Sequence, residues 1–73
     1  MSKLPQVSGS DTVRVLEKFG FIVRRQHGSH IILRRDNPFA QTVVPNHKQI
    51  DRGTLRAILR QTGIGVDEFT KQL

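Results

Sequence analysis

Three histidines, His27, His30 and His47, hold the clearest potential for chemistry in this sequence. The unperturbed pKa of histidine is about 6.5, so an imidazole can accept and donate protons near neutral pH. In an extended segment, residues two and four apart share a face, which places His30 on the same side as Arg34. Such a pair suits phosphodiester cleavage: the imidazole removes a ribose 2′-hydroxyl proton, and the guanidinium stabilises charge on the phosphate.

Two other kinds of chemistry fit these residues less well. A metal site needs converging ligands, and His27 and His30 stand three apart across a Gly-Ser turn with no carboxylate between them. Ser29 beside His30 resembles a nucleophile with its base, but neighbouring strand residues point to opposite faces. The absence of cysteine excludes disulfides and thiolate metal sites. We therefore expect neither a bound metal nor another cofactor.

Basic side chains are the second chemical feature. The chain has 12 Lys and Arg against 6 Asp and Glu, a formal net charge of +6, which attracts polyanions or an acidic protein partner. Eight of the basic residues lie in the central and C-terminal part of the chain: Arg24, Arg25, Arg34, Arg35, Lys48, Arg52, Arg56 and Arg60. The last three recur every four residues and form one row on a helix. A row of phosphate contacts and an ordinary solvated face both fit that spacing.

Apolar periodicity predicts helices towards both ends of the chain. Ser8, with Asp11 three residues later, forms a capping box that begins a helix over residues 9–19. Asp51 is a favourable N-cap for a second helix over residues 52–62. The expected apolar stripes are Val13, Leu16 and Phe19 (with Val15 beside them) in the first helix, Leu55, Ile58 and Leu59 in the second, and Val66, Phe69 and Leu73 in one last short helix.

Between the helices, β-branched and aromatic residues predict strands at residues 21–26, 30–35 and 41–44. The connections, at residues 27–29 and 36–38, are short turns, so the strands form an antiparallel three-stranded sheet. The order is α-β-β-β-α with a short C-terminal helix. This α+β class buries its apolar residues most simply with the helices on one face of the sheet and the other face open.

The face on which His30 lies stays undecided at this level. Alternation divides the second strand into two sets: His30, Ile32 and Arg34 on one side, Ile31, Leu33 and Arg35 on the other. Both sets contain apolar residues, so either can face the helices. His30 and Arg34 share the open face if Ile31 and Leu33 belong to the core.

Length and composition limit the class of protein. The 73 residues form one domain, 1–73, in which residues 1–7 are an irregular lead-in. No apolar run approaches the about 20 residues of a membrane-spanning helix, and the N-terminus has no apolar signal core. We therefore expect a cytoplasmic protein without a membrane partner.

Three motifs occur in a fixed order along the chain. They are Arg25-Gln26-x-Gly28-Ser29-His30, then Val44-Pro45-x-His47, then Gly53-Thr54-Leu55-x-x-Ile58-Leu59-Arg60-Gln61-x-Gly63. In this order they resemble the HicA toxins, also called YcfA-like proteins, over about residues 8–69. The resemblance implies a double-stranded-RNA-binding-like fold and a small endoribonuclease that cleaves messenger RNA. It also implies a HicB-type antitoxin that holds the toxin inactive.

The resemblance also implies residue roles. The catalytic histidine of the family falls on His30, and Gly28 and Ser29 complete its motif as the turn that presents the imidazole. His47 matches the Pro-x-His segment and is a candidate catalytic helper. His27 stands where similar sequences often have Lys, so its ring need not be catalytic. The eight basic residues are expected to engage RNA because of their charge, and a non-catalytic RNA-binding module of the same fold is the alternative function.

Overall fold

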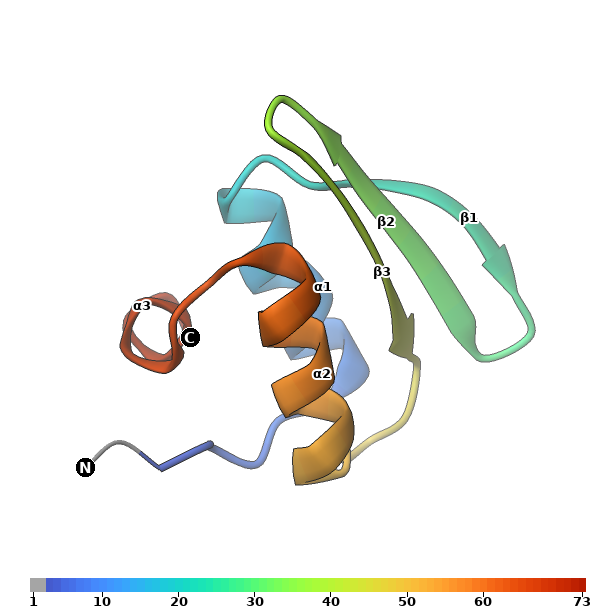
Figure 1. The fold of residues 1–73 in the computed structure, drawn as a ribbon. Coiled ribbons are helices and arrows are strands. Elements are labelled where there is room, and N and C mark those ends of the chain that lie inside the picture. The colour runs from blue at the N-terminus through green and yellow to red at the C-terminus, as the bar shows by residue number, and fades with distance from the viewer. Residues whose placement is uncertain (1–2) are drawn as a thin grey trace.

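The computed structural model describes residues 3–73. Figure 1 shows the strands side by side with the helices on one side of them. This architecture confirms the predicted α+β class, and the three strands form one antiparallel sheet in the order β1-β2-β3. The elements are α1 (Gly9–Lys18), β1 (Ile22–His27), β2 (His30–Asp36), β3 (Phe39–Pro45), α2 (Arg52–Thr62) and α3 (Val66–Lys71).

Side-chain burial decides which face of the sheet is covered. On β2, Ile31 and Leu33 are buried, and their partners on β3 are the buried Val44 and Thr42. Ile31, Leu33 and Val44 pack with apolar residues of the helices in a single core, and Thr42 is buried as well. The alternate residues of each strand therefore lie on the open face, and His30 is one of them.

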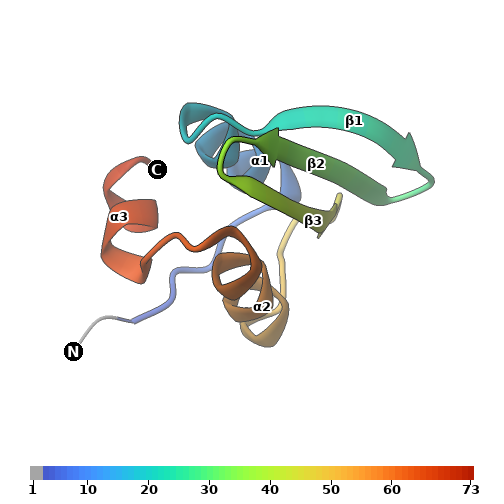
Figure 2. The same ribbon diagram turned by 45° about the horizontal axis from the view of Figure 1, so that its top comes forward.

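The helix boundaries follow from local hydrogen bonds. Ser8 accepts the N–H of Asp11 at 3.0 Å in the predicted capping box, and Asp51 accepts two backbone N–H groups at the start of α2. Gly63 ends α2 with φ of 74°, in the left-handed region. Figure 2 shows α3 at the end of the helical layer, away from the strands.

The predicted apolar stripe of α1 was wrong in part. The buried side chains are those of Thr12, Val15 and Leu16, whereas Val13 and Phe19 are only partly buried. Thr12 can be buried because its hydroxyl donates to the carbonyl of Ser8 at 2.9 Å. That bond satisfies its polar atom, so the core-facing stripe is rotated towards Thr12.

The strand boundaries differ from the predicted ranges at both turns. β1 begins and ends one residue later than predicted, because Phe21 is buried in the core and His27 still pairs with β2. β3 begins at Phe39 instead of residue 41, because Asp36 and Phe39 pair directly across the second turn. Both connections are thus tighter than the sequence pattern indicated.

Residues 3–7 have no regular secondary structure, yet this segment contributes to the core; residues 1–2 of the predicted lead-in lie outside the described residues. Leu4 and Val7 are buried, and the carbonyl of Leu4 accepts a hydrogen bond from Nε of Arg52 at 3.3 Å. Along residues 3–73, no helix is long and apolar enough to cross a membrane.

Candidate active site

His30 is the first residue of β2 and is exposed on the open face of the sheet. Its neighbour Ile31 points into the core, and this alternation turns the imidazole away from the helices. Ile32 and Arg34 follow on the same face. His30 and Arg34 therefore share the open face, which the sequence alone left undecided.

A two-residue turn presents His30. Gly28 has φ of 57°, a left-handed value that glycine adopts without steric cost, and a Cβ built there would meet no atom within 4 Å. Glycine is therefore favoured at position 28 by the backbone conformation and not by a lack of space for a side chain. The side-chain Nε2 of Gln26 donates to the carbonyl of Gly28 at 3.0 Å, and the N–H of Asn46 donates to the carbonyl of Ser29 at 2.6 Å.

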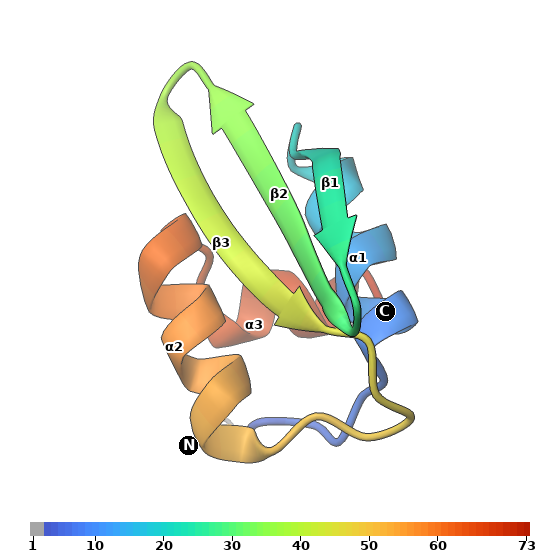
Figure 3. The same ribbon diagram turned by 90° about the vertical axis from the view of Figure 1, so that its right-hand side faces the viewer.

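The loop after β3 brings His47 to the same end of the sheet. Asn46 bonds to Ser29 in the turn, and the carbonyl of His47 accepts the N–H of Gly9 at 2.8 Å. Figure 3 shows this loop leaving β3 beside the turn between β1 and β2. His47 is exposed. The structure therefore gathers the turn, His30 and the backbone of His47 at one end of the sheet.

His27 also belongs to this end of the sheet, which the sequence analysis did not anticipate. It is the last residue of β1 and pairs directly with His30. Nη1 of Arg25 lies 3.4 Å from its Nε2. The signal was present in the sequence, because a turn of only two residues makes its flanking residues cross-strand partners.

The arginine predicted to act with His30 stands some distance along the strand. Arg34 is four residues from His30, roughly 13 Å at about 3.3 Å per residue, with Ile32 between them. Its Nε bonds to Asp36 at 2.9 Å. Arg25 pairs with Ile32 in the row next to the histidines, so by register Arg25 is the nearer guanidinium.

Arg35 lies on the opposite face from Arg34 and is tied to the protein itself. Its guanidinium sits 4.6 Å from the centre of the Phe21 ring. Three backbone carbonyls accept its N–H groups, those of Pro38 at 2.9 Å, Thr62 at 3.3 Å and Phe19 at 3.4 Å. These contacts join the sheet to α1 and α2, so Arg35 has a structural role. Its guanidinium N–H groups already donate to carbonyls of the protein.

The arginine row of α2 forms a separate basic surface. Arg52 and Arg56 line a hollow of about 470 Å³ with Lys3, Leu4 and Val66, between the N-terminal segment, α2 and α3. The remaining basic residues of the predicted set are exposed: Arg24, which is the extra residue where the β1–β2 register shifts, Lys48 and Arg60. The structure thus divides the eight basic residues among several surfaces.

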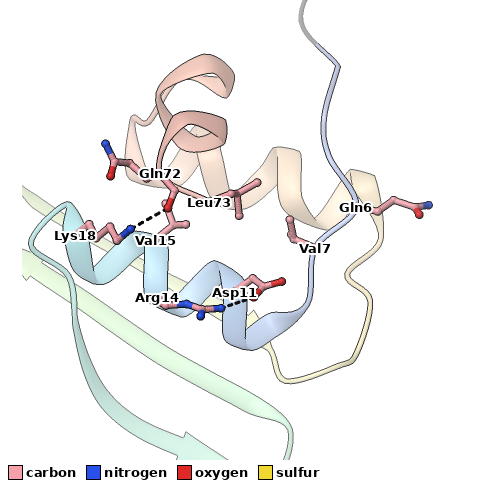
Figure 4. A pocket seen from close by; sticks show the side chains of 8 residues that line it. All are labelled: Gln6, Val7, Asp11, Arg14, Val15, Lys18, Gln72 and Leu73. Atoms are coloured by element: carbon pink, nitrogen blue, oxygen red, sulfur yellow. Dashed lines mark hydrogen bonds and ion pairs between the residues drawn. The ribbon is translucent and has the colours of Figure 1, made fainter.

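A further hollow, of about 340 Å³, lies between the N-terminal segment, α1 and α3 (Figure 4). Its edges are held by the ion pair of Arg14 with Asp11 and by Nζ of Lys18, which donates to the carbonyl of Gln72 at 3.0 Å. The residues that line it are Gln6, Val7, Asp11, Arg14, Val15, Lys18, Gln72 and Leu73. None of the three histidines is among them, so this hollow is distinct from the candidate site.

Large apolar side chains are uncovered on the open face. Ile22, Val43 and Phe39 are 60%, 43% and 68% exposed, and Ile32 is partly exposed between them. In the register of the sheet, Val43 pairs with Ile32 and Ile22 pairs with Arg34. An apolar surface bordered by arginine and histidine is typical of a face that contacts another molecule.

Binding of a metal ion would require several ligating side chains that lie close together. Within residues 3–73, no three or more His, Asp or Glu side chains come together as metal ligands would. The carboxylate of Asp36 bonds to Arg34 at the far end of β2. At the other end, the open-face strand residues Arg25, His27 and His30 are all basic.

Comparison with known families gives a match that covers most of the chain. The family model described as the HicA toxin of bacterial toxin–antitoxin systems matches residues 9–64 of the 73-residue chain. The match begins at the first residue of α1 and includes the whole sheet, both tight turns and all of α2. No curated protein matches the chain.

Proposed function

The chain belongs to the HicA toxin family of bacterial toxin–antitoxin systems, and we propose that it acts as a metal-independent endoribonuclease that cleaves messenger RNA. The observation that carries the proposal is the position of His30, exposed on the open face at the start of β2 and presented by the Gly28–Ser29 turn. A general base must reach the proton that it abstracts, and an uncovered imidazole beside basic side chains meets that condition for RNA.

His30 is assigned as the general base. It takes the proton of a ribose 2′-hydroxyl, the 2′-oxygen attacks the adjacent phosphorus, and the bond from phosphorus to the 5′-oxygen breaks. The products are a 2′,3′-cyclic phosphate and a 5′-hydroxyl. Negative charge grows on the phosphate oxygens during the attack, and Arg25 is the nearest guanidinium by register that can stabilise it. This route uses the side chains of the protein alone.

The basic residues of the open face would hold the RNA backbone. Arg25 and Arg34 border the apolar side chains of this face, and Lys48 lies in the loop that reaches the turn. Arg52, Arg56 and Arg60 offer a second surface on α2 for the strand as it leaves the site. Contacts of this kind are electrostatic and independent of base sequence.

A HicB-type antitoxin would inhibit most simply by covering the open face. A toxin of this family implies an antitoxin partner. The open face that carries His30 at one end also carries exposed Ile22, Val43 and Phe39 together with arginines. Apolar side chains of the antitoxin would bury this surface, and its acidic groups would pair with the arginines. Binding there would block RNA from His30.

The proposal is tested by RNA cleavage with purified protein in EDTA. Wild type is expected to cut RNA and to leave 2′,3′-cyclic phosphate ends, whereas His30→Ala and His30→Gln should lose cleavage and still bind RNA. Because His30 is exposed, both variants should keep the wild-type melting temperature. Cleavage by His30→Ala at the wild-type rate would disprove the assignment. RNA binding without cleavage by wild type would favour the non-catalytic RNA-binding module.

A further inference from the structure

Two histidines face each other across the hairpin of the proposed site. His27 ends β1, His30 begins β2, and the two are direct partners in the antiparallel register. Side chains at such a pair point to the same face, and their Cβ atoms are about 4.5–5.5 Å apart. Both residues are exposed. The two imidazoles therefore stand next to each other on the open face, where a phosphodiester can reach both.

The proposed reaction needs a second proton-transfer group. Attack by the 2′-oxygen forms a bond to phosphorus and releases one proton to the base. Breaking the bond to the 5′-oxygen leaves an alkoxide, which must gain one proton to depart as a hydroxyl. The cleavage step thus takes one proton from RNA and returns one to it. A pair of histidines, one neutral and one protonated, supplies both transfers without another reactant.

We propose that His27 is a catalytic residue, the general acid that protonates the departing 5′-oxygen while His30 acts as the base. This inference rests on the proposed function, because His27 has this role only if the protein cleaves RNA. After the cleavage step His27 is neutral and His30 is protonated, and exchange with solvent restores both. The charge on protonated His27 would also stabilise the attacked phosphate.

The surroundings of His27 fit a group that meets a phosphate. Nη1 of Arg25 lies 3.4 Å from Nε2 of His27. A phosphate bound by this guanidinium would therefore lie beside the His27 imidazole as well. The other titratable groups at this end of the sheet are His30 on β2 and His47 and Lys48 in the loop tied to the turn. Asp11, in the first turn of α1, lines a hollow with Lys48.

The general-acid role is tested with a leaving group that needs no proton. An RNA oligonucleotide with sulfur in place of the 5′-oxygen at the cleaved bond releases a thiolate. On ordinary RNA, His27→Ala should lower kcat/KM by about 10²- to 10⁴-fold, and on the sulfur substrate most of that loss should disappear. His30→Ala should be impaired on both substrates. An equal loss for His27→Ala on both substrates, or no loss on either, would overturn the inference.

The pH dependence of kcat/KM is a second, independent readout. The base must be unprotonated and the acid protonated, so the plot of kcat/KM against pH should be bell-shaped for wild type. The fall at high pH reports loss of the proton from the acid. His27→Ala should remove the high-pH side, and His27→Lys should move it upward, since the unperturbed pKa of lysine is about 10.4. Gln26→Ala, which removes a turn hydrogen bond but keeps both imidazoles, should keep both sides of the bell.

The same measurement separates His27 from His47. If His47→Ala removes the high-pH side and His27→Ala keeps it, His47 is the proton donor and the inference about His27 is wrong. If wild type cuts neither the ordinary nor the sulfur substrate, the proposed function fails as well. Cleavage by wild type with an unchanged His27→Ala variant would overturn only the role of His27.

Discussion

The backbone N–H of Asn46 donates to the carbonyl of Ser29 at 2.6 Å. This bond joins the loop after β3 to the turn between β1 and β2, and its two residues are 17 positions apart in the sequence. It fixes the turn from outside the hairpin, while Gln26 fixes it from β1. The direction of the His30 side chain therefore depends on a turn that is held at both of its residues.

The turn conformation should matter more for cleavage than for stability, and two matched glycines test this. Gly28 and Gly63 both have positive φ, and a Cβ at either position would meet no atom within 4 Å. Alanine at each should lower the free energy of unfolding by about 1–2 kcal/mol, because both positions strain an L residue. Only Gly28→Ala should also lower kcat/KM for RNA cleavage. Equal cleavage by the two folded variants would contradict the role of the turn.

Alanine substitutions at the neighbouring Arg34 and Arg35 of β2 should affect different properties, RNA binding and stability respectively. Arg35→Ala removes hydrogen bonds to three carbonyls and the contact with Phe21, so it should lower the free energy of unfolding by about 1–3 kcal/mol in urea denaturation. Arg34→Ala loses one pair with the exposed Asp36, worth at most about 1 kcal/mol, and should instead weaken RNA binding. A stable Arg35→Ala variant with weak RNA binding would reverse these roles.

Local signals predicted the helices well, because each of their ends depends on a few adjacent residues. The Ser8 capping box, the Asp51 cap and the left-handed Gly63 are short-range features, and all three are present. Thr12 was missed as a core residue because its burial depends on a hydrogen bond to Ser8 that satisfies the hydroxyl. A hydrophobicity pattern counts Thr as polar whether or not that bond forms.

The site was harder to predict, because it depends on which face of the sheet the helices cover. Ile31 and Ile32 are equally apolar, yet one is buried and the other lies on the open face. The choice of covered face also separates Arg34, on the open face, from Arg35, on the covered face. Their charge alone had assigned both to RNA binding. The partnership of His27 and His30 required the true length of the turn, and residues 27–29 were predicted as the turn when only Gly28 and Ser29 form it.

Salt dependence distinguishes the two basic surfaces. Each phosphate contact with single-stranded nucleic acid contributes about 0.7 to the slope of log K against log salt concentration. Arg25→Gln should reduce the slope for RNA binding by about 0.7. The double variant Arg52→Gln, Arg56→Gln should reduce it by about 1.4 if α2 also contacts the backbone, as proposed. An unchanged slope for the double variant would identify the α2 row as an ordinary solvated face.

The open face should be the surface on which the antitoxin binds, and an acidic substitution there is a direct test. Val43 is 43% exposed in the row next to His30, so Val43→Glu places a charge among apolar contacts and opposes acidic groups of the antitoxin. We expect at least a 10-fold weaker complex with the purified antitoxin by calorimetry. Leu73→Glu is the matched control, because Leu73 is 53% exposed but lies at the C-terminus beside α1, away from the histidines. Equal binding of the antitoxin by the two variants would show that it inhibits from another surface.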